Sequence, residues 1–199
     1  NLTAASVEKA LTPRSKAIIA VHLAGWPCEM DEFLALAKKR GLVVVEDCAQ
    51  SVGARYKDRA TGSIGNIGAF SFCQDKILTT GGEGGMLVTD TRALWEKAWS
   101  YKDHGKSYAA VYERDHPFGF RWLHESFGSN RRITEMQSAI GRLQLKKLPQ
   151  WLATRRHNAA MLDQGLSAIP GLRLAAPPAH SEHAYYKYYT FIRTEMLRP

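Results

Sequence analysis

One lysine, Lys76, stands where an amine could act as a nucleophile. It follows the apolar, aromatic run at residues 69–73 and precedes a glycine-rich turn at residues 81–85. Burying an ammonium group is costly, so ordinary lysines lie on solvated faces. Beside low-dielectric surroundings an amine reaches its neutral form more readily, and a neutral amine can form a Schiff base with a carbonyl carbon. The alternative is a surface lysine at a strand end, and this window alone leaves both open.

Two carboxylates occur upstream, at the end of the expected strand 42–47. This strand is β-branched and ends in Glu46 and Asp47, a composition typical of a buried, parallel strand. Ligands of open α/β sheets bind at the carboxyl ends of the strands, which is where we expect Asp47. An acid that pairs with a pyridinium nitrogen and a Schiff-base lysine are the two protein groups that pyridoxal phosphate requires. Capping of a helix is the alternative role for such an acid.

Alternating strands and helices must position these side chains. The hydrophobic periods predict helices at 6–11, 30–40 and 91–102, and strands at 17–21, 42–47, 68–73 and 86–89. The strand, helix and strand between residues 17 and 47 form a right-handed, parallel βαβ unit. Residues 103–130 have no period and are long for a loop. A long helix, kinked or broken at Pro149, is expected over 134–168, followed by strands at 171–174 and 185–192.

Several motifs in fixed order resemble those of one enzyme family. They are residues 46–54, the strand 68–72, Lys76, the turn 82–85 and residues 130–137. Together they are similar to the sugar aminotransferases of the DegT/DnrJ/EryC1/StrS family, pyridoxal phosphate enzymes of fold type I. The match runs from about Lys16 to Arg156, and the remaining residues continue it.

The resemblance implies an α/β fold, a three-layer α/β/α arrangement around a mostly parallel sheet. Residues 1–150 would form an incomplete cofactor-binding major domain, and residues 151–199 a linking helix and the start of a small α+β C-terminal domain. Family members are about twice as long and begin with a glycine- and threonine-rich phosphate loop that these residues lack. We therefore expect the chain to be a fragment, and an alternative is a folded fragment without cofactor or activity.

The resemblance also assigns roles to five residues. Lys76 would bind pyridoxal 5'-phosphate and act as the general base, and Asp47 would pair with the ring nitrogen. Gln50 would lie near the cofactor's phenolic oxygen, with a turn amide as its alternative. Ser71 would bind the cofactor phosphate, with a backbone-satisfied hydroxyl as its alternative. Asn130 would reach the phosphate of the other subunit in a homodimer with shared active sites, and it could also be the N-cap of the following helix.

The implied reaction transfers an amino group, from a donor such as glutamate, to a nucleotide-linked keto-sugar. The product would be an amino sugar for a surface polysaccharide or a secondary metabolite. Some family members dehydrate their substrate and carry histidine in place of the lysine, so Lys76 argues against that branch.

Composition narrows the class of protein. The 199 residues carry a net charge of +8 and three cysteines, too few and odd in number for a disulfide framework. No spacing of cysteine and histidine indicates a zinc site, and neither a membrane span nor a signal peptide is visible. We therefore expect a cytoplasmic protein that binds neither membrane nor metal. A basic nucleic-acid-binding module is a third interpretation, but the positive charges are scattered and it leaves the ordered motifs unexplained.

Three further features have structural interpretations. The turn at residues 81–85 lacks the lysine-threonine ending of a P-loop, so we expect its glycines to permit positive φ and close approach of the backbone to the cofactor or a partner. His22 is expected to be a satisfied core histidine. The tyrosines between Tyr185 and Tyr189 are expected to form a half-buried strand that could border a sugar site.

Overall fold

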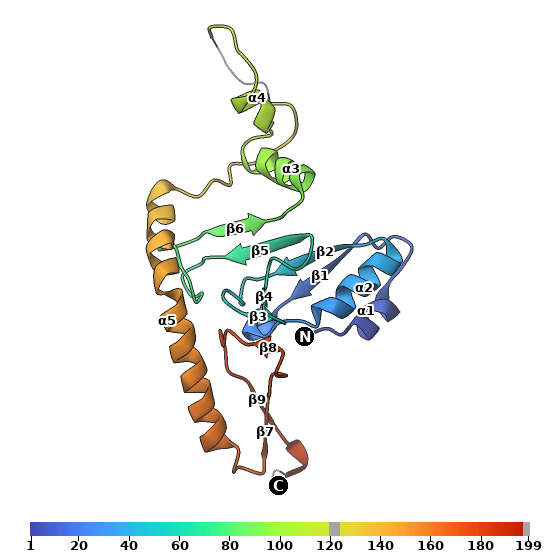
Figure 1. Cartoon of the computed structure of the whole chain (residues 1–199), viewed down its shortest axis with the longest axis vertical. Coiled ribbons are helices and arrows are strands. Elements are labelled where there is room, and N and C mark those ends of the chain that lie inside the picture. Colours follow the sequence, from blue (N-terminus) through green and yellow to red (C-terminus); the bar gives the residue numbers. More distant parts are fainter. Residues whose placement is uncertain (120–123, 197–199) are drawn as a thin grey trace.

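The computed structural model describes residues 1–119 and 124–196. At its centre lies a four-stranded sheet in the order β1-β2-β5-β6 (Figure 1). The strands are β1 (Ala17–Val21), β2 (Val43–Asp47), β5 (Ile67–Ser71) and β6 (Gly85–Val88). The first three are parallel, and β6 is antiparallel to β5. The predicted α/β class with a mostly parallel sheet is confirmed.

The βαβ unit forms as predicted. Helix α2 (Met30–Arg40) connects β1 to β2 and ends at Gly41, which has a φ of 64°. Such a left-handed residue ends a helix at little cost when it has no Cβ. With α1 (Ala4–Ala10), α2 covers one face of the sheet, and Phe33 packs there against Ile18 and Val44.

The opposite face of β1 and β2 is open. Strand β1 alternates exposed and buried residues, and Ile19 and Val21 on the open face are 59% and 38% exposed. Because side chains alternate along a strand, every second apolar residue of β1 faces α2 and the residues between them face solvent. In the described residues, 1–119 and 124–196, helices therefore cover one face of β1 and β2 only. These helices are α1 and α2.

Residues 103–119 and 124–130 follow α3 (Arg92–Lys102) and extend beyond β6 at the top of Figure 1. This predicted loop contains a short helix, α4 (Tyr108–Tyr112), which Ser107 caps through its side chain. The segment returns to the end of α3, where Asp103 bridges to Asn130 and the Ser129 N–H donates to the Tyr101 carbonyl at 2.7 Å. Residues 120–123 of this predicted loop lie outside the described residues.

A kink or a break was predicted at Pro149, and helix α5 (Glu135–Leu166) runs through this residue without a break. Proline removes one hydrogen bond and leaves the carbonyl four residues earlier without its partner. That carbonyl belongs to Leu145, which is exposed to water, while Leu148 and Leu152 are buried on either side of the proline. Packing on both sides therefore keeps the helix continuous.

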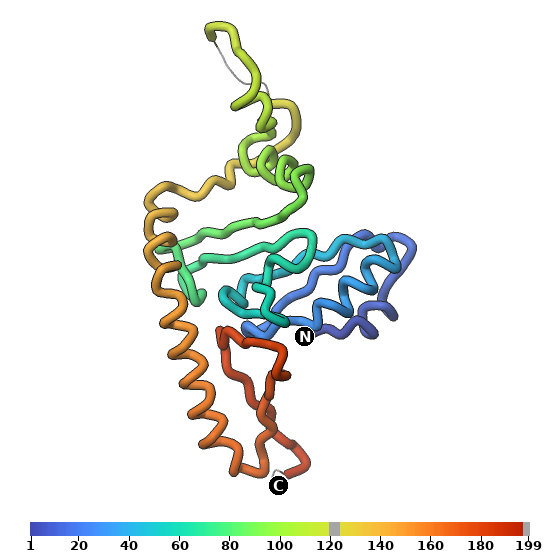
Figure 2. Tube along the Cα trace, viewed as in Figure 1, coloured from blue at the N-terminus to red at the C-terminus, as the bar shows by residue number. Residues whose placement is uncertain are grey.

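The C-terminal region lies beside the lower half of α5 (Figures 1 and 2). Strands β7 (Leu172–Leu174) and β9 (Thr190–Ile192) pair antiparallel, and β8 (Ser181–Glu182) joins β3 (Arg55–Tyr56) and β4 (Arg59–Ala60) in a small second sheet. Short 3-10 turns occupy Leu23–Gly25 and Thr194–Met196. Within the described part of the chain, no helix combines the length and apolar character needed to cross a bilayer.

The strand predicted over 185–192 forms only in its last three residues. Tyr185 has a φ of +49°, which a strand does not allow. The N–H groups of Ala184 and Lys187 donate instead to the carbonyls of Gly25 and Ala24, in the turn after β1. The prediction is therefore wrong for residues 185–189, because this segment packs on a turn and not on a neighbouring strand.

Candidate active site

The two carboxylates that end β2 point to opposite faces of the sheet. Glu46 is fully buried on the face that packs on α2, together with Val44. Asp47 is half-buried and belongs to the other face. Alternation of side chains along the strand requires this separation. The sequence motif thus supplies one acid to the core and one to the open face.

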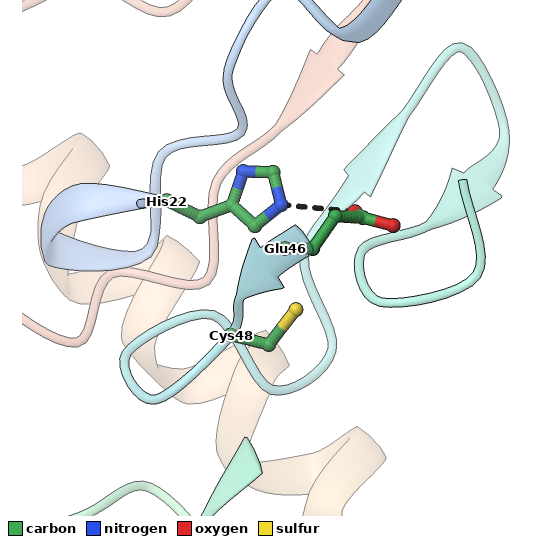
Figure 3. A group of neighbouring side chains, drawn as sticks. All are labelled: His22, Glu46 and Cys48. Atoms are coloured by element: carbon green, nitrogen blue, oxygen red, sulfur yellow. Dashed lines mark hydrogen bonds and ion pairs between the residues drawn. The ribbon is translucent and has the colours of Figure 1, made fainter. Parts of the chain in front are cut away.

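Glu46 is held by four hydrogen bonds, and Figure 3 shows the one with His22. Its Oε1 accepts from the N–H groups of Ile64 and Gly65, at 2.7 and 2.6 Å. Its Oε2 accepts from the N–H of Gly62 at 2.8 Å and pairs with His22 Nε2 at 3.0 Å. Burial raises the pKa of Glu46, but the bonds from His22 and the three N–H groups outweigh it, so the pKa lies below its ordinary value.

The proton of His22 is fixed by its neighbours. The Cys28 N–H donates to Nδ1 at 3.0 Å, so Nδ1 is unprotonated and Nε2 carries the proton donated to Glu46. Cys48 completes a buried group whose possible metal-ligating atoms lie within 4.8 Å of one another. Burial raises the pKa of Cys48 to about 12, so its thiol stays protonated. Hydrogen bonding already engages both nitrogens of His22, and the expectation of a satisfied core histidine is confirmed.

Asp47 and Ser71 share the open face. Asp47 lies opposite Ala69 of β5, and Ser71 follows two residues later on the same face, opposite Gly85 of β6. Asp47 Oδ1 accepts from the Ala49 N–H at 3.0 Å, and Ser71 Oγ accepts from a backbone N–H at 3.4 Å. The Ser71 bond uses its oxygen and leaves its proton to donate. The two polar groups thus lie among small residues at the carboxyl ends of parallel strands.

Gln50 lies against the turn that follows β1. Its Oε1 accepts from the Ala24 N–H at 2.6 Å, where the chain turns with a φ of +61°. The expected alternative, an amide that stabilises a turn, is therefore present. The bond occupies the side-chain oxygen only, so the amide nitrogen is not used by it and can donate elsewhere.

Lys76 belongs to the turn that leaves β5. Its N–H donates to the carbonyl of Cys73 at 3.1 Å, and the next residues, Ile77 and Leu78, are buried in a second apolar cluster with α5. The Lys76 side chain is only 16% exposed. Its Nζ lies 5.1 Å from the centre of the Tyr186 ring. The alternative of a freely solvated surface lysine does not describe this side chain.

Two residues beside Lys76 were missed by the sequence analysis. Asp75 Oδ1 lies 3.9 Å from Lys76 Nζ, and Tyr186 donates its phenolic proton to Asp75 Oδ2 at 2.5 Å. The tyrosine run was visible in the sequence, but no pattern connected it to the lysine turn. The contact spans 111 residues and depends on where the C-terminal segment packs.

Asn130 lies apart from these groups. It is exposed, bridges to Asp103 after α3, and its Oδ1 accepts from Arg132 Nε at 3.2 Å. It is not the N-cap of α5, because Thr134 fills that position in a reciprocal capping box with Gln137. The N-cap prediction for Asn130 is therefore wrong, and its side chain is exposed.

The glycine-rich turn after Lys76 has the predicted positive φ angles at Gly81 and Gly82. Gly82 has a φ of +153°, and a Cβ on Gly84 would lie 2.3 Å from the side-chain oxygen of Thr80. A larger residue at either position would strain the turn. The glycines therefore allow this turn to close against its own chain.

The donor set of four residues at the ends of β2 and β5 and in the turns beside them fits pyridoxal phosphate. It comprises a sheltered amine, a carboxylate, a hydroxyl with a free proton and an amide nitrogen, from Lys76, Asp47, Ser71 and Gln50. A cavity of about 620 Å³ lies elsewhere, between the turn after β1 and strands β7 and β9, and none of these four residues lines it.

Comparison with known proteins places these features in context. Residues 1–198 match the model of the DegT/DnrJ/EryC1/StrS aminotransferase family. The chain is similar to the L-glutamine:2-deoxy-scyllo-inosose aminotransferase of Micromonospora echinospora, with 37% identity over 94% of the chain and 44% of the relative. It is also similar to the UDP-N-acetyl-3-dehydro-alpha-D-glucosamine 3-aminotransferase of Acidithiobacillus ferrooxidans, with 38% identity over 94% of the chain and 47% of the relative.

Solved structures agree with these sequence matches. The X-ray structure of the aminotransferase from Psychrobacter cryohalolentis is 54% identical, with a TM-score of 0.93 over 100% of this chain and 52% of that chain. The chain thus spans about half the length of the curated relatives it matches.

Proposed function

The chain belongs to the DegT/DnrJ/EryC1/StrS aminotransferase family, and we propose that the protein that carries it transfers an amino group to a nucleotide-linked keto-sugar. The observation that supports this most is the shared open face of Asp47 and Ser71, with Lys76 only five residues beyond Ser71. Ligands of open α/β sheets bind at such strand ends.

Pyridoxal 5'-phosphate, when bound, supplies an electron sink for the carbon that loses its proton. In this proposal the Lys76 amine holds the cofactor covalently. The Asp47 carboxylate keeps a proton on the ring nitrogen through its negative charge. Two observations support these roles: Asp47 ends β2 on the open face, and Lys76 lies in the turn that leaves β5.

Lys76 has a second role in the proposal. When its amine is not bonded to the cofactor, Lys76 would act as the general base that moves a proton from the substrate carbon to the cofactor. General-base catalysis of this kind contributes about 10²–10⁴-fold to a rate. The low exposure of the Lys76 side chain keeps bulk water from competing for the amine.

Three polar residues would orient the cofactor. The Ser71 hydroxyl donates to its phosphate, and the Gln50 amide nitrogen donates to its phenolic oxygen. Asn130 is exposed on its own subunit, which supports a role at the phosphate of a second subunit. The active protein would then be a homodimer with shared sites.

The names of the relatives support the substrate class. One names a UDP-linked 3-dehydro sugar, and another names L-glutamine as the donor to a deoxy-inosose. We propose glutamate as the donor here, with glutamine as the alternative to test. The three free cysteines support a cytoplasmic protein. We also propose that residues 1–150 belong to the cofactor-binding domain and residues 151–199 to a linker and a smaller domain.

The test uses the full-length protein that carries this chain. Purified protein is incubated with pyridoxal 5'-phosphate, reduced with borohydride, and digested for mass spectrometry of the Lys76 peptide. We expect a label on Lys76, loss of that label in Lys76→Ala, and its retention in Lys9→Ala, a control at an exposed position in α1. A label that persists in Lys76→Ala would contradict the assignment.

The same protein is then given glutamate or glutamine with a panel of nucleotide-linked keto-sugars. We expect amination of at least one sugar, and none by Lys76→Ala. A protein that neither fixes the cofactor nor aminates any sugar would favour the alternative of a folded but inactive chain.

A further inference from the structure

The C-terminal segment reaches the lysine turn through one side chain, Tyr186. Its hydroxyl donates to Asp75 Oδ2 at 2.5 Å, and its ring lies beside the Lys76 amine, with Nζ 5.1 Å from the ring centre. Tyr186 also packs partly against the apolar cluster that holds Ile77 and Leu78. One tyrosine thus contacts both the acid and the amine of the turn.

Tyr186 is fixed by the backbone on both sides of it. The Ala184 N–H donates to the Gly25 carbonyl at 2.9 Å, and the Lys187 N–H donates to the Ala24 carbonyl at 3.2 Å. On α5, Arg155 donates to the Tyr185 carbonyl at 3.0 Å. The phenol is therefore presented to the lysine turn from a segment anchored to the turn after β1 and to α5.

The ionisation of the pair is defined. The hydrogen bond from Tyr186, with a second from Cys73, lowers the pKa of Asp75, and the bond to Asp75 raises the pKa of Tyr186 to about 12. At neutral pH Asp75 is therefore a carboxylate and Tyr186 a donor. Asp75 is 59% exposed, so hydrogen bonds and not packing restrain its rotation.

Asp75 is a potential competitor for the amine. Its Oδ1 stands 3.9 Å from Lys76 Nζ, beyond hydrogen-bond distance. The two groups already form a long ion pair, and a rotation that closed the gap by about 1 Å would turn it into a direct charged hydrogen bond, since N–H···O⁻ bonds are about 2.7–2.9 Å long. An amine in such a pair has no lone pair free for a carbonyl carbon.

We propose that Tyr186 is a positioning residue for Lys76. The Tyr186 hydroxyl binds the Asp75 carboxylate and so prevents this acid from approaching the Lys76 amine. The inference rests on the proposed function, in which the Lys76 amine must be free to react. It gives the C-terminal segment a specific role at the reacting group.

The test measures the chemistry of the Lys76 amine in the full-length protein without its cofactor. One readout is the rate at which pyridoxal 5'-phosphate becomes fixed to Lys76, trapped with borohydride. The other is the rate at which acetic anhydride acetylates Lys76, which needs no cofactor. Mass spectrometry of the Lys76 peptide reports both rates, with the acetylation of the other lysines as internal standards.

Tyr186→Phe removes the hydroxyl and keeps the ring. We expect both rates at Lys76 to fall about two- to fivefold, the range set by a partly exposed ion pair. Asp75→Asn removes the competitor, so Tyr186→Phe combined with Asp75→Asn should react at the rate of Asp75→Asn alone. Tyr188→Phe is the matched control, because Tyr188 makes a similar bond of 2.6 Å to Asp163 on α5 and should leave both rates unchanged.

The outcomes separate this inference from the proposed function. Tyr186→Phe at wild-type rates, a double variant that stays slow, or an equal loss in Tyr188→Phe would overturn the positioning role. A wild-type protein that never fixes pyridoxal 5'-phosphate, yet shows the expected acetylation pattern, would refute the proposed function while supporting the position of Tyr186.

Discussion

Glu46→Gln is the substitution whose effect the structure defines most closely. The change keeps the shape of the side chain and removes its charge. The carboxylate now accepts four hydrogen bonds, two at each oxygen. An amide accepts at one end only, so its NH2 group would face two donors. If the amide oxygen keeps the hydrogen bonds from the N–H groups of Ile64 and Gly65, the NH2 group faces the Gly62 N–H and the protonated Nε2 of His22, and neither can donate to it.

The magnitude follows from these lost bonds. A hydrogen bond to a charged group contributes about 1.5–3 kcal/mol, so two such bonds amount to about 3–6 kcal/mol. Removing a buried charge recovers part of its desolvation energy, which leaves a net loss of about 2–4 kcal/mol. His22 cannot adapt by moving its proton to Nδ1, because that atom accepts from the Cys28 N–H.

Denaturant unfolding of the full-length protein measures the effect. The control is Asp47→Asn at the next residue, where one accepted bond from Ala49 survives in the amide, and we expect a loss below about 1 kcal/mol. Equal losses in the two variants, or a loss below about 1 kcal/mol in Glu46→Gln, would refute the assignment of the charge to the core.

The pH dependence gives an independent check on Glu46. Its folded pKa lies below the unfolded value, so its contribution to stability is present above about pH 4.5 and is lost as the pH falls through the folded pKa. The stability difference between wild type and Glu46→Gln should therefore be constant near neutral pH and shrink below about pH 4.5.

Two further predictions concern the cofactor. Asp47→Asn should slow proton abstraction from the substrate far more than it weakens cofactor binding, as measured by single-turnover kinetics and titration; equal turnover would refute the pairing with the ring nitrogen. Asn130→Ala should weaken cofactor binding, and mixing its subunits with Lys76→Ala subunits should restore about one quarter of the activity, because half of the dimers would hold one intact site. No recovery in hybrid dimers that native mass spectrometry detects would show that Asn130 does not act across the interface.

Much of the sheet could be predicted from local pattern. The strand at 17–21, the helix at 30–40 and Gly41 follow from hydrophobic period and a left-handed helix end, and the structure has them at those positions. The location of Asp47 at a strand end follows from the same pattern, since parallel strands present their carboxyl ends together.

Local pattern could not predict contacts between distant segments, or choose between two residues that are both suited to the same position. Asn130 and Thr134 are both good N-caps, and only the reciprocal bond to Gln137 selects Thr134. Residues 185–189 include four tyrosines, which favour strands, but they form no strand because the turn after β1 binds their backbone. The same placement brings Tyr186 to Lys76, so the missed strand and the missed site residue have one cause.

The adjacent acids at the end of β2 explain how one strand serves both stability and chemistry. On the face that packs on α2, Glu46 binds His22 at the end of β1 and the backbone of the loop 62–65, and these bonds need its charge. Asp47, one residue later, must then point to the open face, where its carboxylate accepts one hydrogen bond, from the Ala49 N–H. A one-residue slip of register would exchange the two faces, burying the functional acid and exposing the structural one. The bonds of Glu46 therefore hold the register on which the position of Asp47 depends.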